Sequence, residues 1–493
     1  MVFYEQESGA GQILPPPDAD RARREPRLGK GTLTQKLLAK FAGYRPALER
    51  ALRSTVGKNA LSLYSVQFAQ YVLPLITVPY LVRVLGPERL GTLFFGQSLI
   101  AYIGLGVDYG FGLSATRKIS AEREDIVAVN RIASTVWAAK ALLAVGGLSI
   151  LLFLLRVVPR FQALSSLMLI LFVGVVGGVL FPTWLFQGLE KMVPISVINM
   201  SVRTLCALAM FVLVRRPEDY LVYAALMSFG ALLAGLAGVW IAIRKLRVRF
   251  VLPRWLDIWD CLREGCVSFL TMGAISFYTS ANGLILGFLT NDLMVGFYSA
   301  AQKVVGLAMS VWGPLSQAVY PRFSKLAVDS KQLALQWGRK MLIVMGAVGL
   351  LISVTLFLAA PLIIKVAFGP RYQSSVTTLR LLSPLPFLVA VNNVLGFQVL
   401  FPFHREKAFL ASVAVGGAVN LALAFLLAPA WKANGMAFSV MMAEVAVTAV
   451  EFGYLWKTHL NPLQVGENSS IQVGAQLRAR PEEVPVADIP ADR

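Results

Sequence analysis

Long apolar runs alternate with short polar segments along most of the chain, from residue 59 to residue 456. Each run has about 20 residues or more, which is the length that a helix needs to cross a bilayer. Twelve such runs are expected, at 59–82, 91–113, 132–155, 164–187, 193–214, 220–243, 265–289, 293–319, 341–360, 381–402, 408–428 and 433–456. The pattern predicts an all-α polytopic membrane protein with twelve transmembrane helices.

The first two runs are separated by Gly86-Pro87, a turn too short to leave the membrane surface. Residues 74–117 are therefore predicted to form a transmembrane helical hairpin. Three positions of this hairpin recur 205 residues later: Gly91 with Gly296, Gln97 with Gln302, and Arg117 with Arg322. A Glu-Lys pair also recurs, at an offset of 216 residues: Glu190-Lys191 with Glu406-Lys407. The repeat predicts two pseudo-symmetric six-helix lobes, an architecture of transporters whose substrate site lies between the halves.

The repeat also predicts how the chain is divided. Two lobes are expected around a basic cytoplasmic linker, with a polar, disordered cytoplasmic tail at each end. The expected parts are the N-terminal tail at 1–57, the N-lobe at 58–243, the linker at 244–264, the C-lobe at 265–456 and the C-terminal tail at 457–493. Within the first tail, residues 33–54 have the pattern of a basic amphipathic helix that docks on a membrane, or of a solvated or over-extended start.

Composition and charge agree with a membrane protein and set its orientation. The 493 residues are 56% hydrophobic and 15% charged, whereas soluble domains carry about 25% charged residues. The net charge of +19 lies between the apolar runs, so we assign it to contact with an anionic leaflet rather than with nucleic acid. With the N-terminus in the cytoplasm, the short cytoplasmic loops carry 18 Lys and Arg and the external loops 10. This asymmetry predicts that both termini are cytoplasmic.

Cysteines and histidines give no sign of a metal site or of catalysis. The three cysteines, Cys206, Cys261 and Cys266, have no repeated spacing and form neither a disulfide framework nor a zinc motif. The two histidines, His404 and His459, lie 55 residues apart. The sequence therefore predicts no catalytic residues, no metal ligands and no cofactor.

Six ionisable residues fall inside the expected spans. A charge at the bilayer centre costs roughly 2.5–3.5 kcal/mol even on the lenient insertion scale, so these side chains must face a wet cavity or one another. They are Asp108, Lys140, Arg203, Lys303, Glu444 and Glu451.

The three basic residues of this set predict an anion-binding cavity. Arg203 is central in its span and shares a face with Asn199, one turn earlier. Lys303 lies beside Gln302, and Lys140 is nearer the cytoplasmic end of its span. Each basic residue either binds substrate or pairs with an acid on a neighbouring helix, and Lys140 is also able to snorkel. Guanidinium and ammonium groups suit phosphate, so the expected substrate is anionic.

The acidic residues allow two interpretations each. Glu444, Thr448 and Glu451 lie at i, i+4 and i+7 and so share one face of their helix. The two carboxylates either couple transport to a proton or sodium gradient or balance the charge of nearby cations. Asp108 lies among glycines that permit close helix packing, and it either pairs with Arg117 or acts in gating.

The hairpin carries a family resemblance. The run from Pro79 to Gly86 (PYLVRVLG), followed by Gly91, Gln97, Asp108-Tyr109-Gly110-Phe111 and Ala115-Thr116-Arg117, resembles the Wzx-type O-antigen and polysaccharide flippases. These belong to the multidrug/oligosaccharidyl-lipid/polysaccharide exporter superfamily. The resemblance implies two lobes that rock in alternating access in the bacterial inner membrane. The implied substrate is an oligosaccharide on undecaprenyl pyrophosphate, moved from the cytoplasmic to the periplasmic leaflet for O-antigen, exopolysaccharide or capsule synthesis.

The resemblance also implies roles for residues and partners. Arg83, Asp108 and Arg117 match the motif, and we expect them, with the repeat-related Arg322, to act in gating or lobe contacts. The expected protein is a monomeric transporter and not an enzyme, and it works with the bilayer, a polysaccharide polymerase and a chain-length regulator.

Three alternatives remain at this stage. A drug/cation antiporter on the same fold would prefer an acidic cavity. A membrane-embedded polysaccharide polymerase or ligase would need a sizeable external catalytic loop. A scaffold for the polysaccharide machinery would not need buried charges.

Overall fold

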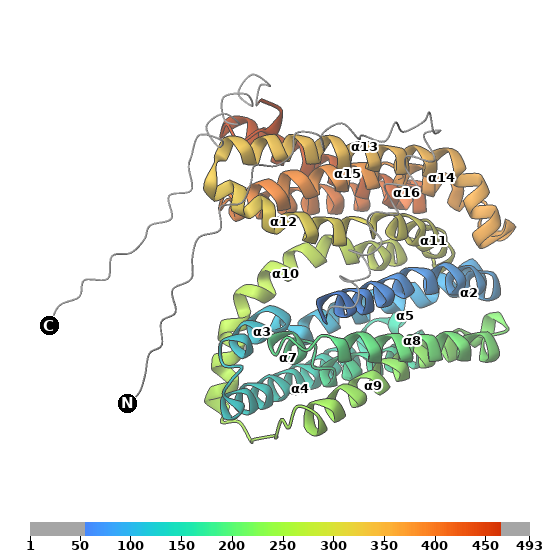
Figure 1. Ribbon diagram of the computed structural model, residues 1–493. Coiled ribbons are helices and arrows are strands. Elements are labelled where there is room, and N and C mark those ends of the chain that lie inside the picture. Colours follow the sequence, from blue (N-terminus) through green and yellow to red (C-terminus); the bar gives the residue numbers. More distant parts are fainter. Residues whose placement is uncertain (1–54, 465–493) are drawn as a thin grey trace, which may run out of the picture. The chain divides into compact units, whose positions relative to one another are not determined.

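A computed structural model describes residues 55–464 of the chain, which are helical with short connections and contain no strand (Figure 1). Some side chains within this range are not described; they belong to residues 55–72, 74–75, 267–268, 270–280, 314, 317–318 and 321. Residues 1–54 of the expected tail at 1–57, with its amphipathic helix, and the end of the second tail lie outside the described residues, and α2 begins at Thr55. The chain divides into two units between Tyr64 and Ser65. All packing described below lies within the second unit.

The first half consists of the helices α2 to α9 and one 3₁₀ turn. Their bounds are α2 Thr55–Asp108, α3 Phe111–Ala121, α4 Ile126–Val157, α5 Pro159–Ala163, α6 Ser165–Leu180, α7 Thr183–Gly188, α8 Val193–Leu213, η2 Pro217–Asp219 and α9 Tyr220–Arg244.

The second half contains α10 to α16 with two π-helical segments and two 3₁₀ turns. Their bounds are α10 Trp255–Leu289, α11 Asp292–Met309, α12 Trp312–Asp329, α13 Lys331–Ile363, η3 Ile364–Phe368, η4 Pro370–Tyr372, α14 Ser375–Leu382, α15 Leu385–Asn392, η5 Asn393–Leu400, α16 Glu406–Lys457 and η6 Pro462–Gln464.

Local sequence explains where several helices begin and break. The Asp125 carboxylate accepts hydrogen bonds from two amides of the first turn of α4, and the Asn291 side chain accepts one from the first turn of α11. Gly86, at the predicted Gly-Pro turn, is non-helical with φ 71° and ψ 173°, a conformation that glycine adopts without steric cost. Lys432 breaks α16 between the last two expected spans with a positive φ of 53°.

Eight helical segments of the described chain are long and apolar enough to cross a membrane. They are Ile76–Ala121, Ile126–Val157, Ser165–Gly188, Val193–Leu213, Pro217–Arg244, Lys331–Phe368, Ser375–Leu400 and Glu406–Lys457. The last of these covers two expected spans on either side of Lys432. The expected spans 265–289 and 293–319 are also helical, although they are not among the eight. The helical class is therefore confirmed, while the count of twelve spans stays a prediction.

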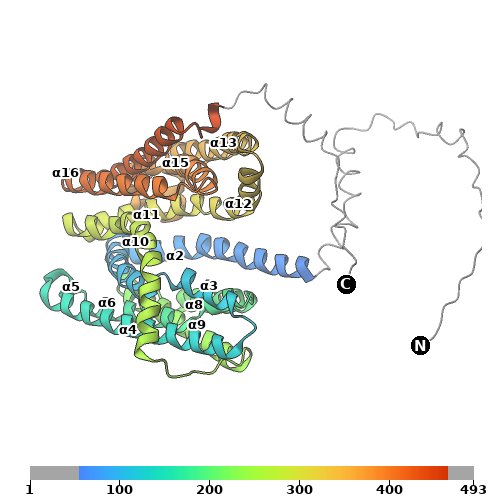
Figure 2. The same cartoon turned by 90° about the vertical axis from the view of Figure 1, so that its left-hand side faces the viewer.

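The helices pack as two bundles that are bridged by α10 (Figures 1 and 2). In the N-terminal bundle, α6 packs along α9, α8 along α9, and α3 against α7. In the C-terminal bundle, α13 packs against α15, and α11 and α16 both pack against α14. The helix α10 contacts α3 and α4 of the first bundle and α11 and α16 of the second. The two bundles are thus joined covalently by a helix that belongs to both.

Two turns, one in each half of the chain, have the same backbone geometry. In both turns an amide donates a hydrogen bond to the carbonyl five residues earlier, and the residue before that amide has a positive φ. The pairs are Lys191 N to Phe186 O at 2.8 Å with Glu190 at φ 57°, and Arg405 N to Leu400 O at 2.9 Å with His404 at φ 55°. These two turns are 214 residues apart, and the turn from Leu460 N to Leu455 O, with His459 at φ 53°, has the same geometry. The match of Glu190-Lys191 with Glu406-Lys407 at an offset of 216 residues stays a prediction.

The chain after α16 remains packed for several residues. The sequence pattern places the start of the polar tail at residue 457, whereas Leu460, Asn461 and Pro462 are buried. Leu460 joins a core cluster of the C-terminal bundle, so the described part of this segment belongs to the folded structure.

Candidate functional site

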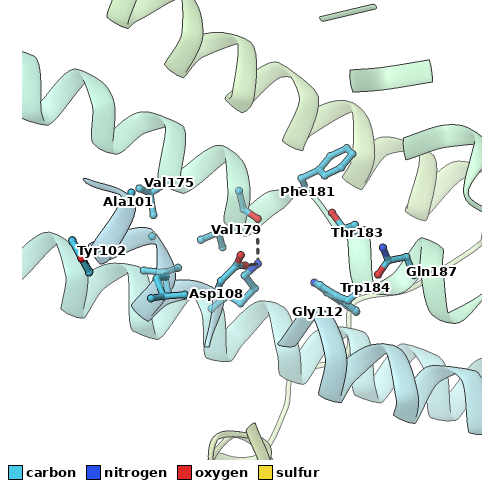
Figure 3. A pocket seen from close by; sticks show the side chains of 15 residues that line it. Ala101, Tyr102, Asp108, Gly112, Val175, Val179, Phe181, Thr183, Trp184 and Gln187 are labelled. Carbon is cyan, nitrogen blue, oxygen red and sulfur yellow. Dashed lines mark hydrogen bonds and ion pairs between the residues drawn. The ribbon is translucent and has the colours of Figure 1, made fainter. Parts of the chain in front are cut away.

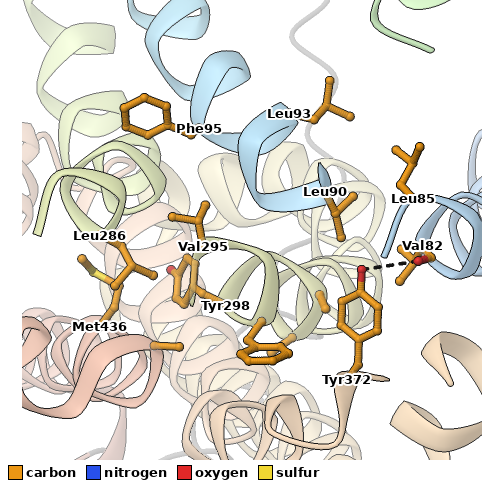
Figure 4. Close-up of a cluster of buried hydrophobic side chains, with 14 of the residues drawn as sticks. Val82, Leu85, Leu90, Leu93, Phe95, Leu286, Val295, Tyr298, Tyr372 and Met436 are labelled. Carbon is orange, nitrogen blue, oxygen red and sulfur yellow. Dashed lines mark hydrogen bonds between the residues drawn. The ribbon is translucent and has the colours of Figure 1, made fainter. Parts of the chain in front are cut away.

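The two bundles share one hydrophobic core at the end where Gly86 lies. This core combines Leu81 to Ile100 of α2 with Leu286 of α10, Val295 and Tyr298 of α11, and Met436 of α16 (Figure 4). Because buried apolar surface is the main favourable term in association, this end is held closed by contact between the bundles.

The opposite ends have separate cores. One cluster is formed by α3, α4, α7 and neighbouring residues of the N-terminal bundle, including Phe111, Trp184 and Val248. Another contains residues of α12, α13, η5 and the segment after α16, including Phe323 and Leu460. Apart from residues of the bridging helix α10, neither cluster contains a described residue of the other bundle, so the two ends of the structure differ in how the bundles are joined.

At the closed end, α2 and α11 cross with their backbones in contact at Gly91 and Gly296. A Cβ on Gly91 would overlap the carbonyl oxygen of Asp292, and a Cβ on Gly296 would overlap that of Pro87. Pro87 and Asp292 are themselves 205 residues apart, so each half makes the same contact to the other. The crossing therefore has the isologous form of a symmetric dimer interface. The two glycines of the sequence repeat are the residues that permit it.

An ion pair that the sequence analysis missed lies beside this crossing. Arg160 of α5 donates to the Asp292 carboxylate at 2.5 Å and also to the carbonyl of Gly287. Thr92 of α2 donates to the other Asp292 oxygen at 2.5 Å. The Arg160 guanidinium lies 4.4 Å from the centre of the Phe95 ring. Because both ion-pair side chains are only about a quarter exposed, the pair links the bundles more strongly than an ordinary surface ion pair.

Arg83 is also at the closed end. Its guanidinium donates to the carbonyl of Val366 in η3, and the hydroxyl of Tyr372 donates back to the carbonyl of Val82 at 3.4 Å (Figure 4). Arg83 thus contacts the other bundle, as the hairpin motif implies. Arg117 is exposed on α3, and Arg322 stacks on the Trp337 ring at 4.3 Å.

The N-terminal bundle contains a pocket of about 620 Å³ between α2, α4, α6 and α7. Lys140 is 3% exposed there and donates to the Asp108 carboxylate at 2.6 Å and to the Gly178 carbonyl at 3.3 Å. Asp108 is 70% exposed and projects into the pocket, between Tyr102 at one end and Gln187 at the other (Figure 3). Asp108 is therefore paired with Lys140 and not with Arg117.

Arg203 and Asn199 lie in a different pocket, of about 450 Å³, between α2, α8 and α9. The other lining is largely apolar and includes Leu81, Met210 and Tyr223. Arg203 is exposed, and no described carboxylate forms an ion pair with it. Arg203 and Lys140 thus do not line one pocket, contrary to the single cationic group expected from the sequence.

Lys303 and Gln302 are half-buried on α11, the helix that crosses α2. The side-chain oxygen of Gln302 is buried and accepts no hydrogen bond from a described residue. Neither residue lines the pockets of Lys140 or Arg203. The five expected substrate-binding residues therefore fall into three places on the two bundles.

The acids of α16 lie in a polar network inside the C-terminal bundle. The Glu444 carboxylate accepts a hydrogen bond from Asn392 at 2.8 Å, and Thr448 donates to the Asn392 oxygen at 2.5 Å. Glu451 is fully buried, and one of its oxygens accepts from Ser412 at 3.1 Å. Its other oxygen has no hydrogen-bond partner among the described residues. None of the described ion pairs includes Glu451.

The described residues contain no group of three or more His, Cys, Asp or Glu that could hold a metal ion.

Comparisons with known proteins identify the family to which this chain belongs. Residues 56–327 match the family described as "Polysaccharide biosynthesis protein". The chain belongs to this family. It is 31% identical over 396 residues to the "Putative O-antigen transporter" of Escherichia coli (strain K12), covering 80% of this chain and 95% of that protein. It is 29% identical over 391 residues to the protein of the same name from Shigella dysenteriae, covering 79% and 97%. The resemblance read from the hairpin is confirmed.

Solved structures give the fold of this family member. The chain matches a multidrug resistance MATE family transporter of the MOP superfamily in an inward-facing conformation, with a TM-score of 0.63 and 15% identity over 80% of this chain and 96% of that one. It matches the lipid II flippase MurJ in an inward closed conformation with a TM-score of 0.61 and 13% identity, over 86% and 94%. Together with the eight apolar segments, these matches identify a multi-pass membrane protein.

Proposed function

We propose that the protein is a flippase that moves undecaprenyl-pyrophosphate-linked oligosaccharide units across the bacterial inner membrane for O-antigen, exopolysaccharide or capsule synthesis. The observation that carries this proposal is the nearly full-length similarity to two relatives named as O-antigen transporters. The fold is common to drug transporters and to a lipid flippase, so it does not favour a drug/cation antiporter.

The proposed topology has twelve spans in two six-helix lobes, with both termini in the cytoplasm. The excess of Lys and Arg in loops on one side supports it. In this orientation the shared core, the Gly91–Gly296 crossing and the Arg160–Asp292 pair lie on the periplasmic side. The separate cores lie on the cytoplasmic side, which corresponds to an inward-open state of an alternating-access cycle.

In the proposed cycle, the charged head group enters between the lobes from the cytoplasm while the polyprenyl tail stays in lipid. Arg203 is the strongest candidate for holding the pyrophosphate or acidic sugars, because no described acid neutralises its charge. Lys303 and Gln302 of α11 would also bind the head group, as would Asn199, which lies one turn before Arg203 on α8. Lys140 would act together with Asp108, as an ion pair that interacts with the head group.

The periplasmic contacts must break for release, and we assign gating to the residues that make or adjoin them. Arg83 bridges to η3 directly. In the proposed topology, the repeat-related Arg117 and Arg322 would lie at the cytoplasmic ends of the two lobes and would contact the opposite lobe when that side closes. We further propose that the transporter is a monomer without enzymatic activity, and that its partners include a polysaccharide polymerase and a chain-length regulator.

Replacing Arg203 or Lys303 by alanine is expected to abolish surface polysaccharide at normal protein levels. Loss of a hydrogen-bonded charge pair with phosphate costs about 1.5–3 kcal/mol, or roughly 10- to 100-fold in binding. The measurement is surface polysaccharide in a flippase-deletion strain carrying each variant, with the variant protein quantified in the membrane. Arg156→Ala, at an exposed arginine in the last turn of α4, is the control and should transport normally. Normal polysaccharide in both test variants would remove these residues from the site.

We also propose that Glu451, with Glu444, couples transport to a proton or sodium gradient. The buried carboxylate with one oxygen unsatisfied among the described residues supports a site that exchanges a cation. Glu451→Gln is expected to keep the fold, because the amide oxygen still accepts from Ser412, but to lose the dependence of flipping on an imposed gradient. The measurement is flipping of lipid-linked oligosaccharide in proteoliposomes with and without the gradient. Glu406→Gln, at an exposed position of the same helix, should respond to the gradient as the natural protein does. An unchanged response of Glu451→Gln would contradict the coupling role.

A further inference from the structure

The segment between the bundles is fixed to α4 by its own backbone. The amide of Arg249 donates to the Asn130 side chain at 2.9 Å, and the amide of Val251 donates to the Ser134 hydroxyl at 2.9 Å. Val248 is 1% exposed and belongs to a core cluster of the N-terminal bundle. The side chains that point away from α4 are therefore held in place rather than free to turn inward.

The first turns of α10 continue this segment and have two different faces. Asp257, Asp260, Cys261 and Glu264 recur at helical spacing and line a small cavity of about 240 Å³ against α3 and α4. Glu264 forms an ion pair with Lys118 of α3 at 2.6 Å. Burial raises the pKa of the Cys261 thiol to about 11. Cys261, with Ile258 and Leu262, packs against a core cluster of the N-terminal bundle, whereas Asp260 and Glu264 are exposed at the edge of the cavity.

The outward side carries five large apolar side chains, which we call the linker patch. They are Phe250, Leu252, Trp255, Leu256 and Trp259, and they are between 59% and 85% exposed. On α10 the patch residues lie at i, i+1 and i+4, so they share one side of the helix. An apolar patch of this kind on a fixed backbone is rare in contact with water and marks an interaction surface.

The charge around the linker patch is positive. Residues 244–264 contain six basic and three acidic residues. The acids line the small cavity, where Glu264 pairs with Lys118, and Asp260 is exposed one turn after Leu256. The exposed basic side chains beside the patch are Arg247, Arg249, Arg254 and Arg263. A surface that combines tryptophan with arginine complements an apolar layer that carries negative charge.

Exposed apolar residues at the end of α9 precede the linker patch in the chain. Trp240 and Ile243, in the last turns of this apolar helix, are 57% and 52% exposed. The chain then leaves α9 at Arg244, and the patch begins six residues later. With α9 as a membrane span, as in the topology proposed above, the short connection would hold the patch near the membrane surface.

We propose that the linker patch binds the interfacial region of an anionic lipid leaflet. Tryptophan prefers this layer because its ring is apolar and its N–H is polar, and arginines beside it attract anionic head groups. The segment then acts as a monotopic element that anchors the junction between the bundles to the membrane surface. In the orientation proposed above, this surface is the cytoplasmic leaflet.

A depth measurement on the full-length protein tests the proposal. An environment-sensitive fluorophore is attached at Leu252→Cys in a background of Cys206→Ala, Cys261→Ala and Cys266→Ala, which removes the three free thiols. The protein is reconstituted in phosphatidylcholine vesicles with or without phosphatidylglycerol, and nitroxide-labelled lipid is the quencher. The matched control is Ser120→Cys, an exposed polar position at the end of α3. Leu256→Cys gives a second position in the patch if the first variant does not reconstitute.

The expected result is a blue-shifted emission at position 252 that lipid nitroxide quenches more strongly than at position 120. Phosphatidylglycerol should increase this quenching, and Arg249→Gln with Arg254→Gln should remove the increase while leaving the signal in phosphatidylcholine. Emission and quenching equal to those at position 120 would overturn the proposal, because the patch would then be in water. A blue shift without quenching would also overturn it, because a protein surface would then cover the patch.

Discussion

Gly91→Ala is expected to abolish polysaccharide transport and to destabilise the protein. The added Cβ would overlap the Asp292 carbonyl and crowd the backbone of Gly296, so α2 and α11 must separate. Overpacking of this kind costs about 1–3 kcal/mol where the surroundings relax, and more where backbone meets backbone. The separation would also pull Thr92 from Asp292 and weaken the ion pair with Arg160. The protein would then be unable to form its closed end.

Gly106→Ala is the matched control, because it lies on the same helix and its Cβ would meet no atom within 4 Å. The greater helix propensity of alanine should leave this variant as stable as the natural protein or about 1 kcal/mol more stable. The measurements are the thermal unfolding midpoint of the purified protein and surface polysaccharide in a deletion strain. If Gly91→Ala matches Gly106→Ala in both, the crossing is not the contact that closes this end.

Asp108→Asn is expected to destabilise the N-terminal bundle, because the neutral amide oxygen still accepts a hydrogen bond but no longer balances the charge of the buried Lys140 ammonium. An unpaired buried charge of this kind costs about 1–3 kcal/mol or more. Adding Lys140→Met should restore stability, since methionine keeps most of the side-chain volume without the charge. The measurement is the unfolding midpoint of the two single variants and the double variant.

The double variant separates stability from transport. If the Lys140–Asp108 pair takes part in holding the head group, the double variant unfolds normally and still fails to produce surface polysaccharide. If the double variant produces normal surface polysaccharide, the Lys140–Asp108 pair has only a structural role. The control is Glu264→Gln, which breaks the half-exposed pair with Lys118 and should change stability by less than about 1 kcal/mol. Asp108→Asn with natural stability would show that the pair contributes nothing to the fold.

Several features of the fold and of the site could be predicted from the sequence, and others were missed. The Gly86-Pro87 turn, the break between the last two spans and the repeat of Gly91 with Gly296 were all readable from local pattern. The polar face of Glu444 and Glu451 was also readable, because helical periodicity places residues at i and i+7 on one side. Arg160 and Asp292 were missed, since each lies at the end of an apolar run and looks like an ordinary loop charge. A signal existed for Asp292, which follows Pro87 at the repeat offset of 205 residues.

The sequence by itself determined that the chain is a helical membrane protein of the polysaccharide biosynthesis family, because run length, charge and the hairpin motif are local properties. Only the tertiary structure decided that Lys140 is paired with Asp108 and that Arg203 lies in a separate pocket. It also decided that the bundles share a core at one end alone. The physical reason is that hydropathy fixes where a helix begins and ends, but not its rotation about its axis or its neighbours. Those depend on packing between residues that are distant in the chain.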